Sequence, residues 1–193
     1  MLVFKKIVSL QHETQIIVTM LKRKFTGYLE QYLQSNPDKI LLVNGARQIG
    51  KSYTIRYVGK KMFRHFIEIN LKEDKEGEQV FADVHTTNDL YMRLSNYPAR
   101  HLGDKSDTLV FLDEIQSYPH LLTMLKFLNQ EGRYRFIASG SQLGIALSQT
   151  PSVPLGSIET QQMYPLDFEE FLWATGISDE WIGEIRKHFE CED

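Results

Sequence analysis

The residues of this chain with the clearest chemical potential are two glycines, a lysine and a serine at fixed spacing. Gly45, Gly50, Lys51 and Ser52 fit the pattern G-x-x-x-x-G-K-[ST] in full. In this pattern the glycines let backbone N–H groups surround a phosphate, because no side chain stands in the way. The lysine ammonium reaches the outer phosphates of a nucleotide, and the hydroxyl can ligate Mg²⁺. The motif therefore predicts a phosphate-binding loop, and the alternative is an ordinary turn.

The predicted loop extends slightly beyond the motif itself, into the first turn of the helix that follows. The residues predicted to contact the nucleotide are Gly45, Ala46, Arg47, Gln48, Ile49, Gly50, Lys51, Ser52 and Tyr53.

Two adjacent carboxylates form a second chemical feature. Asp113 and Glu114 directly follow an apolar run, Leu109–Leu112, that is typical of a buried strand. Ligands bind at the carboxyl ends of strands in open parallel sheets, so both acids are predicted to face the phosphates. We expect Asp113 and Ser52 to hold Mg²⁺, and Glu114 to polarise the water that attacks the terminal phosphorus. The alternative is a strand end with two exposed acids.

Two serines end the next apolar run of the sequence. Ser139 and Ser141 follow residues 134–138, so either hydroxyl could lie between the acids and the phosphates and sense the terminal phosphate. A turn that caps the following helix is the alternative, and the pattern does not choose between the serines. Together, the residues predicted to be catalytic are Lys51, Asp113, Glu114, Ser139 and Ser141.

The segments that must position these residues alternate between strands and helices. Apolar runs at 40–43, 63–70, 108–113, 134–138 and 157–163 predict five strands. Helices are expected at 22–36, after residue 52, at 86–98, 117–132, 143–147, 167–175 and from 178 onward, whereas the charged residues 71–78 predict a solvated loop or helix start. The pattern predicts an α/β fold, with a mostly parallel five-stranded sheet flanked by helices in three layers.

Composition limits the classes of protein that remain. The 193 residues suit one domain, and 42% hydrophobic residues argue against a disordered chain. With 22 basic and 25 acidic residues the net charge is −3, which does not indicate a globally basic nucleic-acid binder. Local basic residues at 22–24, 60–61 and 64 leave nucleic-acid binding as an alternative to ordinary surface charge. A single cysteine, Cys191, and the lack of a long apolar run favour a cytoplasmic protein without a membrane span.

Four segments together resemble a known family. They are 45–52, Phe111–Gln116, Ser139–Ser141 and Tyr164–Phe171, the last with the pattern Y-P-L-x-F-x-E-F. In this order they resemble AAA+ P-loop ATPases, specifically the AAA_14 branch that occurs with a C-terminal DUF4143 domain. The resemblance covers residues 20–175, including a basic start at 20–25. It implies a P-loop NTPase core at 20–175, ATP and Mg²⁺ as ligands, and ATP hydrolysis that drives a conformational change.

Two departures from this family change the expectation. Relatives often carry an arginine, a candidate charge-stabilising finger, at the position of Ser157, so this chain is expected to be a slow ATPase or a nucleotide-gated module with little turnover. Arg133 or Arg135 could substitute, although ordinary surface arginines are the alternative. Because AAA+ relatives often supply the finger in trans, a homo-oligomer or a protein partner is compatible with the sequence.

The second departure concerns the ends of the chain. Family members usually continue well past residue 193, so the resemblance predicts a missing C-terminal region that begins with the helix in 176–193. Residues 1–19 are interpreted as an uncertain N-terminal extension, with Met20 as a candidate natural start.

Overall fold

The computed structural model describes residues 21–96, 102–141, 143–144 and 156–190. The chain divides into two compact units. The larger unit, Arg23–Phe171, contains the sheet and all the predicted site residues. The smaller unit comprises residues 1–22 and 172–193. The expectations for residues 1–19 fall outside the described residues.

A five-stranded parallel sheet forms the centre of the larger unit. Its strands, in chain order, are β1 (Ile40–Asn44), β2 (His65–Asn70), β3 (Thr108–Asp113), β4 (Arg135–Gly140) and β5 (Ile158–Gln162). Their spatial order is β2-β3-β4-β1-β5, and each neighbouring pair is parallel. The predicted α/β fold with a parallel sheet is confirmed.

The register of the strands brings their carboxyl ends to one edge of the sheet. Asn44 of β1 is level with Gly140 of β4, and Asn70 of β2 is level with Asp113 of β3. This carboxyl edge therefore collects the residues that follow β1, β3 and β4. The amino edge, where the strands begin, lies about 15 Å away, since β1 has five residues at about 3.3 Å each.

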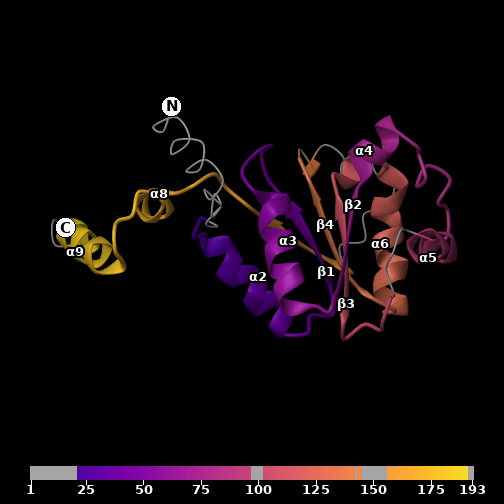
Figure 1. Cartoon of the computed structure of the whole chain (residues 1–193), viewed down its shortest axis with the longest axis horizontal. Helices are drawn as coiled ribbons and strands as arrows, with labels where there is room; N and C mark the ends of the chain where they lie inside the picture. Colours follow the sequence, from indigo (N-terminus) through magenta and orange to yellow (C-terminus); the bar gives the residue numbers. More distant parts are fainter. Residues whose placement is uncertain (1–20, 97–101, 142, 145–155, 191–193) are drawn as a thin grey trace, which may run out of the picture. The chain divides into compact units, whose positions relative to one another are not determined.

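Helices cover both faces of the sheet (Figure 1). Helices α2 (Lys24–Gln34) and α3 (Lys51–Met62) lie on one face, and α4 (Leu71–Glu76), α5 (Thr87–Asn96) and α6 (Pro119–Glu131) lie on the other. Strand β1 shows why two faces are needed. Leu41 and Val43 belong to the core beneath α2 and α3, whereas Ile40 and Leu42 belong to the core beneath α5 and α6. Such continuous apolar runs are typical of strands covered on both sides.

Three local expectations are refined by the structure. The helix expected to open at Ser117 begins at Pro119, because residues 115–117 form a short 3₁₀ turn (η1, Ile115–Ser117). Proline suits the first helical position, where its missing N–H costs no hydrogen bond. The charged segment after Asn70 forms α4, and the Asn70 side chain accepts hydrogen bonds from its first turn. Of the helix expected at 143–147, only residues 143–144 are described, and both are helical.

The last two helices are α8 (Phe168–Ala174) and α9 (Asp179–Glu190). Asp167 and Glu170 cap α8 reciprocally: Asp167 Oδ1 accepts from Glu170 N at 2.8 Å, and Glu170 Oε2 accepts from Asp167 N at 3.1 Å. In the smaller unit, Asp179 accepts hydrogen bonds from Lys22 and from the Trp173 indole. Across the described residues, no helix combines the length and apolar character needed to cross a membrane.

Candidate functional site

The phosphate loop connects β1 to α3, as the motif requires. Residues 45–50 lie between the last residue of β1 and the first residue of α3. A Cβ atom on Gly45 would lie 2.5 Å from the Met163 carbonyl oxygen, so only glycine fits there. Gly50 has φ of +95°, in the left-handed region that glycine adopts without steric cost. Both motif glycines are therefore required by the backbone itself.

Lys51 places its ammonium inside this loop. Its Nζ donates to the carbonyl oxygens of Gly45 at 2.8 Å and Ala46 at 2.7 Å. Burial lowers the pKa of this ammonium, while the charges of Glu114 and Asp113 oppose the shift. Lys51 also opens α3, whose first N–H groups have no partner within the helix and form a natural anion site.

Asp113 lies beside the loop and is buried at the end of β3. The Ser52 hydroxyl donates to Asp113 Oδ2 at 2.6 Å, and the fully buried Ser139 hydroxyl donates to Asp113 Oδ1. One hydroxyl and one carboxylate side by side suit Mg²⁺, which usually takes one or two protein oxygens together with water and substrate phosphates. Within the described part of the chain, no group of three or more His, Cys, Asp or Glu forms a metal site made of protein alone.

Glu114 belongs to a separate hydrogen-bonded group. Its backbone turns into the left-handed region, with φ of 54° and ψ of 46°, which ends β3 and starts η1. Its Oε2 accepts from the Ser141 hydroxyl at 3.2 Å and from Gln116 Nε2. Gln116 Nε2 also lies 3.3 Å from Ser141 Oγ. Sequence reasoning gave Gln116 no role, although its position two residues after Glu114 was visible.

The two serines are therefore distinguished by their partners. Ser139 lies inside β4 and contacts Asp113, whereas Ser141 follows β4 and contacts Glu114. Among the described residues after β4, the Leu143 N–H donates to the Asn44 side chain at 3.2 Å, and most of the helix that either serine would cap lies outside the described residues. Their roles in chemistry stay predictions.

Three other residues predicted to contact the nucleotide lie on the solvent side of the phosphate loop and of α3. Arg47 and Gln48 are exposed, and Gln48 has φ of 63°. Arg47 Nε donates to Ser141 Oγ at 3.4 Å, which links the loop to the Glu114 group. The Tyr53 side chain is 42% exposed on α3.

Arg23 is a contact of the loop that sequence reasoning missed. Its guanidinium donates to the Ile49 carbonyl at 2.8 Å and to the Tyr164 carbonyl at 2.7 Å. Its Nε lies 3.2 Å from Glu170 Oε1, and both side chains are less than a tenth exposed. Arg23 thereby joins the phosphate loop to the segment after β5. The sequence offered only its place in a basic run.

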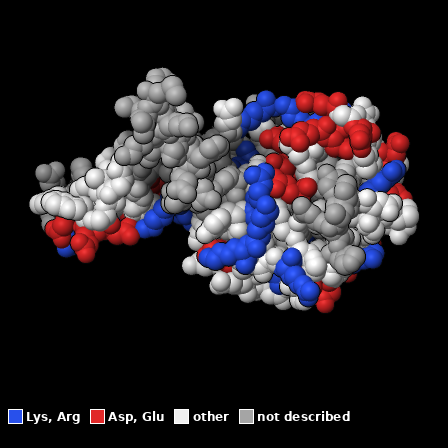
Figure 2. Space-filling view, in the orientation of Figure 1, with Lys and Arg blue, Asp and Glu red and all other residues white. Residues whose placement is uncertain are grey.

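Several of the basic residues considered for nucleic-acid binding are paired with acids. Lys24 pairs with Asp167 at 2.8 Å, and Lys61 pairs with Glu30 at 2.8 Å. Lys22 pairs with Asp179 in the smaller unit. On the face shown in Figure 2, Lys and Arg form separate groups with Asp and Glu between them. The arrangement favours ordinary surface charge over a nucleic-acid patch.

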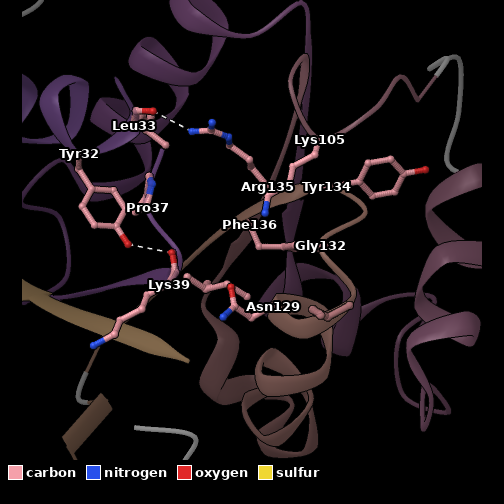
Figure 3. Close-up of a pocket in the computed structure, with 12 residues that line it drawn as sticks. Tyr32, Leu33, Pro37, Lys39, Lys105, Asn129, Gly132, Tyr134, Arg135 and Phe136 are labelled. Atoms are coloured by element: carbon pink, nitrogen blue, oxygen red, sulfur yellow. Dashed lines mark hydrogen bonds between the residues drawn. The ribbon is translucent and has the colours of Figure 1, made fainter. Parts of the chain in front are cut away.

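The substitutes considered for the missing finger lie at the amino edge. Ser157 directly precedes β5, and its carbonyl accepts from Ile40 N at the start of β1. Arg135 donates to the Leu33 carbonyl at 2.7 Å and lines a small cavity of about 30 Å³ (Figure 3). Arg133 lies over the Tyr91 ring at 4.8 Å. Both arginines lie at the amino edge, about the length of a strand from this chain's own phosphate loop, so a substitute role for either stays a prediction for the site of another copy.

Comparisons with known proteins agree with this geometry. The model of the AAA_14 family, described as an AAA domain, matches residues 37–172, which include the phosphate loop, both acids and both serines. No curated protein matches the chain. Among solved structures, the Walker-type ATPase PABY2304 of Pyrococcus abyssi is similar, with a TM-score of 0.53 and 20% identity. That match covers 78% of this chain and 55% of the other.

A structure of two coordinating Pif1 helicases on forked double-stranded DNA also matches. Its TM-score is 0.46 at 12% identity, covering 77% of this chain and 45% of the other. The chain thus spans about half the length of the solved structures that it matches.

Proposed function

The chain belongs to the AAA_14 family of AAA domains, and on that premise we propose that it binds ATP with Mg²⁺ and hydrolyses it to ADP and phosphate. One observation carries the proposal. The Ser52 hydroxyl lies 2.6 Å from Asp113 Oδ2, although 61 residues separate them in sequence. This contact joins the phosphate loop to the acidic strand end, as an ATP–Mg²⁺ site requires.

The binding half of the proposed site is the loop with the start of α3. Backbone N–H groups of residues 46–52 surround the phosphates, and the Lys51 ammonium neutralises charge on the β- and γ-phosphates. Ser52 and Asp113 hold Mg²⁺, with the buried Ser139 hydroxyl fixing the orientation of the Asp113 carboxylate. Bound Mg²⁺ supplies charge neutralisation on the phosphate oxygens.

The hydrolytic half is the Glu114 group. Glu114 orients a water molecule and takes its proton as the water oxygen attacks the γ-phosphorus and the bond to the β-phosphate oxygen breaks. Ser141 hydrogen-bonds to Glu114 and to Arg47 of the loop, so we assign Ser141, rather than Ser139, the position facing the γ-phosphate. Gln116 holds the same carboxylate from the other side.

The test is a pair of measurements on the protein and two variants. Titration with a fluorescent ATP analogue in Mg²⁺ measures binding, and phosphate release measures turnover. We expect Lys51→Ala to lose binding, and Glu114→Gln to bind ATP but release little phosphate. Omission of Mg²⁺ should weaken binding of the triphosphate.

Two outcomes would change this conclusion. If the protein and Lys51→Ala give the same negligible binding, the chain is not an ATP-binding protein. If the protein binds ATP tightly but releases no phosphate at any protein concentration, the nucleotide-gated module is correct and hydrolysis is not. Thermal unfolding of each variant separates these results from loss of fold.

A further inference from the structure

Arg47, the third residue of the phosphate-loop motif, has a guanidinium for which the described residues provide one hydrogen-bond acceptor. The side chain is exposed, and its Nε makes a long hydrogen bond of 3.4 Å to Ser141 Oγ. Among the described residues, no acceptor contacts its terminal amino groups and no carboxylate forms an ion pair with it. A cation at this place thus retains most of its donors for a ligand.

Two other arginines near the loop are engaged by acceptors of the protein itself. The two terminal amino groups of Arg23 donate to the Ile49 and Tyr164 carbonyls. Arg56 forms a bidentate pair with Glu68, with both N–H···O distances at 2.6 Å. Neither can turn to a ligand without breaking charge-assisted hydrogen bonds, which are the strong ones. Arg47 has no such commitment.

The contacts of Arg47 place it on the side of the loop where hydrolysis is proposed. Ser141 Oγ, its acceptor, lies 3.2 Å from Glu114 Oε2. The guanidinium is therefore separated by one serine hydroxyl from the carboxylate assigned to the attacking water. The Lys51 ammonium is a second cation of the same loop, where it donates to two loop carbonyls. A polyanion bound between like charges relieves their repulsion.

We propose that Arg47 binds the γ-phosphate oxygens of ATP from within the same chain and makes the site prefer the triphosphate to ADP. This inference rests on the proposed function. The planar guanidinium fork matches phosphate oxygens, and charge stabilisation of the transferred phosphoryl group follows from the same contact. Ser157, where relatives often carry an arginine, and the possible substitutes Arg133 and Arg135 lie at the amino edge. Arg47 instead supplies a cation at this chain's own loop.

The test compares nucleotide affinities in four proteins. The protein, Arg47→Ala, Arg47→Lys and the control Arg64→Ala are titrated with a non-hydrolysable ATP analogue and with ADP, both in Mg²⁺. Arg64 is exposed just before β2, at the amino edge. We expect Arg47→Ala to weaken binding of the ATP analogue about 10–100-fold while ADP binding changes less than about twofold. Arg47→Lys should fall between, and Arg64→Ala should match the unmodified protein.

A second probe is ADP with aluminium fluoride, which mimics the phosphoryl group in transfer. Arg47→Ala should weaken this complex by at least as much as it weakens the ATP analogue. Equal losses for ADP and the ATP analogue, or no loss for either, would overturn the role of Arg47 while leaving ATP binding intact. If the unmodified protein binds neither nucleotide, the proposed function fails together with this inference. Melting temperatures of all four proteins identify any variant that fails to fold.

Discussion

The two edges of the sheet hold the same kinds of residue in opposite circumstances. At the carboxyl edge, the Lys51 ammonium lies in the loop after β1, and the Asp113 and Glu114 carboxylates at the end of β3 accept from hydroxyls of α3 and of the segment after β4. At the amino edge, Arg135 donates to a carbonyl in the last turn of α2, and the Tyr32 hydroxyl donates to a carbonyl just before β1 (Figure 3). The first arrangement leaves charge available to a ligand, and the second uses polar groups to complete the fold. A residue type therefore says little about function until the edge that carries it is known.

The largest contrast is expected in turnover. Glu114→Gln should reduce phosphate release about 100–1,000-fold, because the amide cannot accept the proton of the attacking water. ATP affinity should change less than about threefold. Glu131→Gln, at the end of α6, is the control and should leave both quantities unchanged. Equal phosphate release from Glu114→Gln and the unmodified protein would remove Glu114 from the catalytic role.

A smaller contrast is expected in binding. Lys51→Ala should weaken ATP binding about 100-fold, since it removes a charged donor from the phosphates. Lys39→Ala, at the amino edge, should leave binding unchanged, because its side chain is exposed beside the small cavity there. Fluorescence titration of both variants makes the comparison. Similar losses in the two would show that the edges do not differ in phosphate binding.

The two serines should separate stability from turnover. Ser139→Ala should lower the free energy of unfolding by about 1–3 kcal/mol, because it leaves the buried Asp113 carboxylate short of a donor. Ser141→Ala should cost less stability, because its partner Glu114 is only half-buried, and should reduce turnover about tenfold, since the hydroxyl contacts the Glu114 carboxylate. Urea unfolding and phosphate release are the measurements. If Ser139→Ala alone slows turnover, the γ-phosphate assignment passes to Ser139.

The smallest effect on nucleotide chemistry is expected at the amino edge. Arg135→Ala should lower the free energy of unfolding by about 1–3 kcal/mol through loss of its bond to the Leu33 carbonyl. Nucleotide affinity should remain within experimental error of the unmodified protein. Urea unfolding followed by ATP-analogue titration checks both. A selective loss of turnover in Arg135→Ala would instead point to a role in a second copy's site.

The sheet and phosphate loop were predictable because their signals are local. A buried strand needs only a run such as 109–112, and the loop needs four residues at fixed spacing. The position of Arg133 and Arg135 relative to the loop was not visible from their spacing. Both precede or begin the fourth strand, so parallel strands place them at the amino edge once the topology is known.

The contacts of other site residues carried no local signal. Arg23 and Glu170 meet only because the fold brings together the start of α2 and the segment after β5. Gln116 is close in sequence to Glu114, yet its contact depends on the left-handed turn of the backbone at Glu114. Such contacts are set by tertiary geometry, which residue spacing alone does not encode.

The Arg23 contacts have a mechanical consequence. The Arg23 guanidinium donates hydrogen bonds to the Ile49 carbonyl in the loop and the Tyr164 carbonyl after β5. It also forms an ion pair with the Glu170 carboxylate in α8. Breaking one partner of a buried ion pair costs several kcal/mol, so these three points act as a stiff linkage. Any displacement of the Ile49 carbonyl must then be shared with the first turn of α8. A change in the shape of the loop is therefore expected to accompany a change in the direction of the chain after β5.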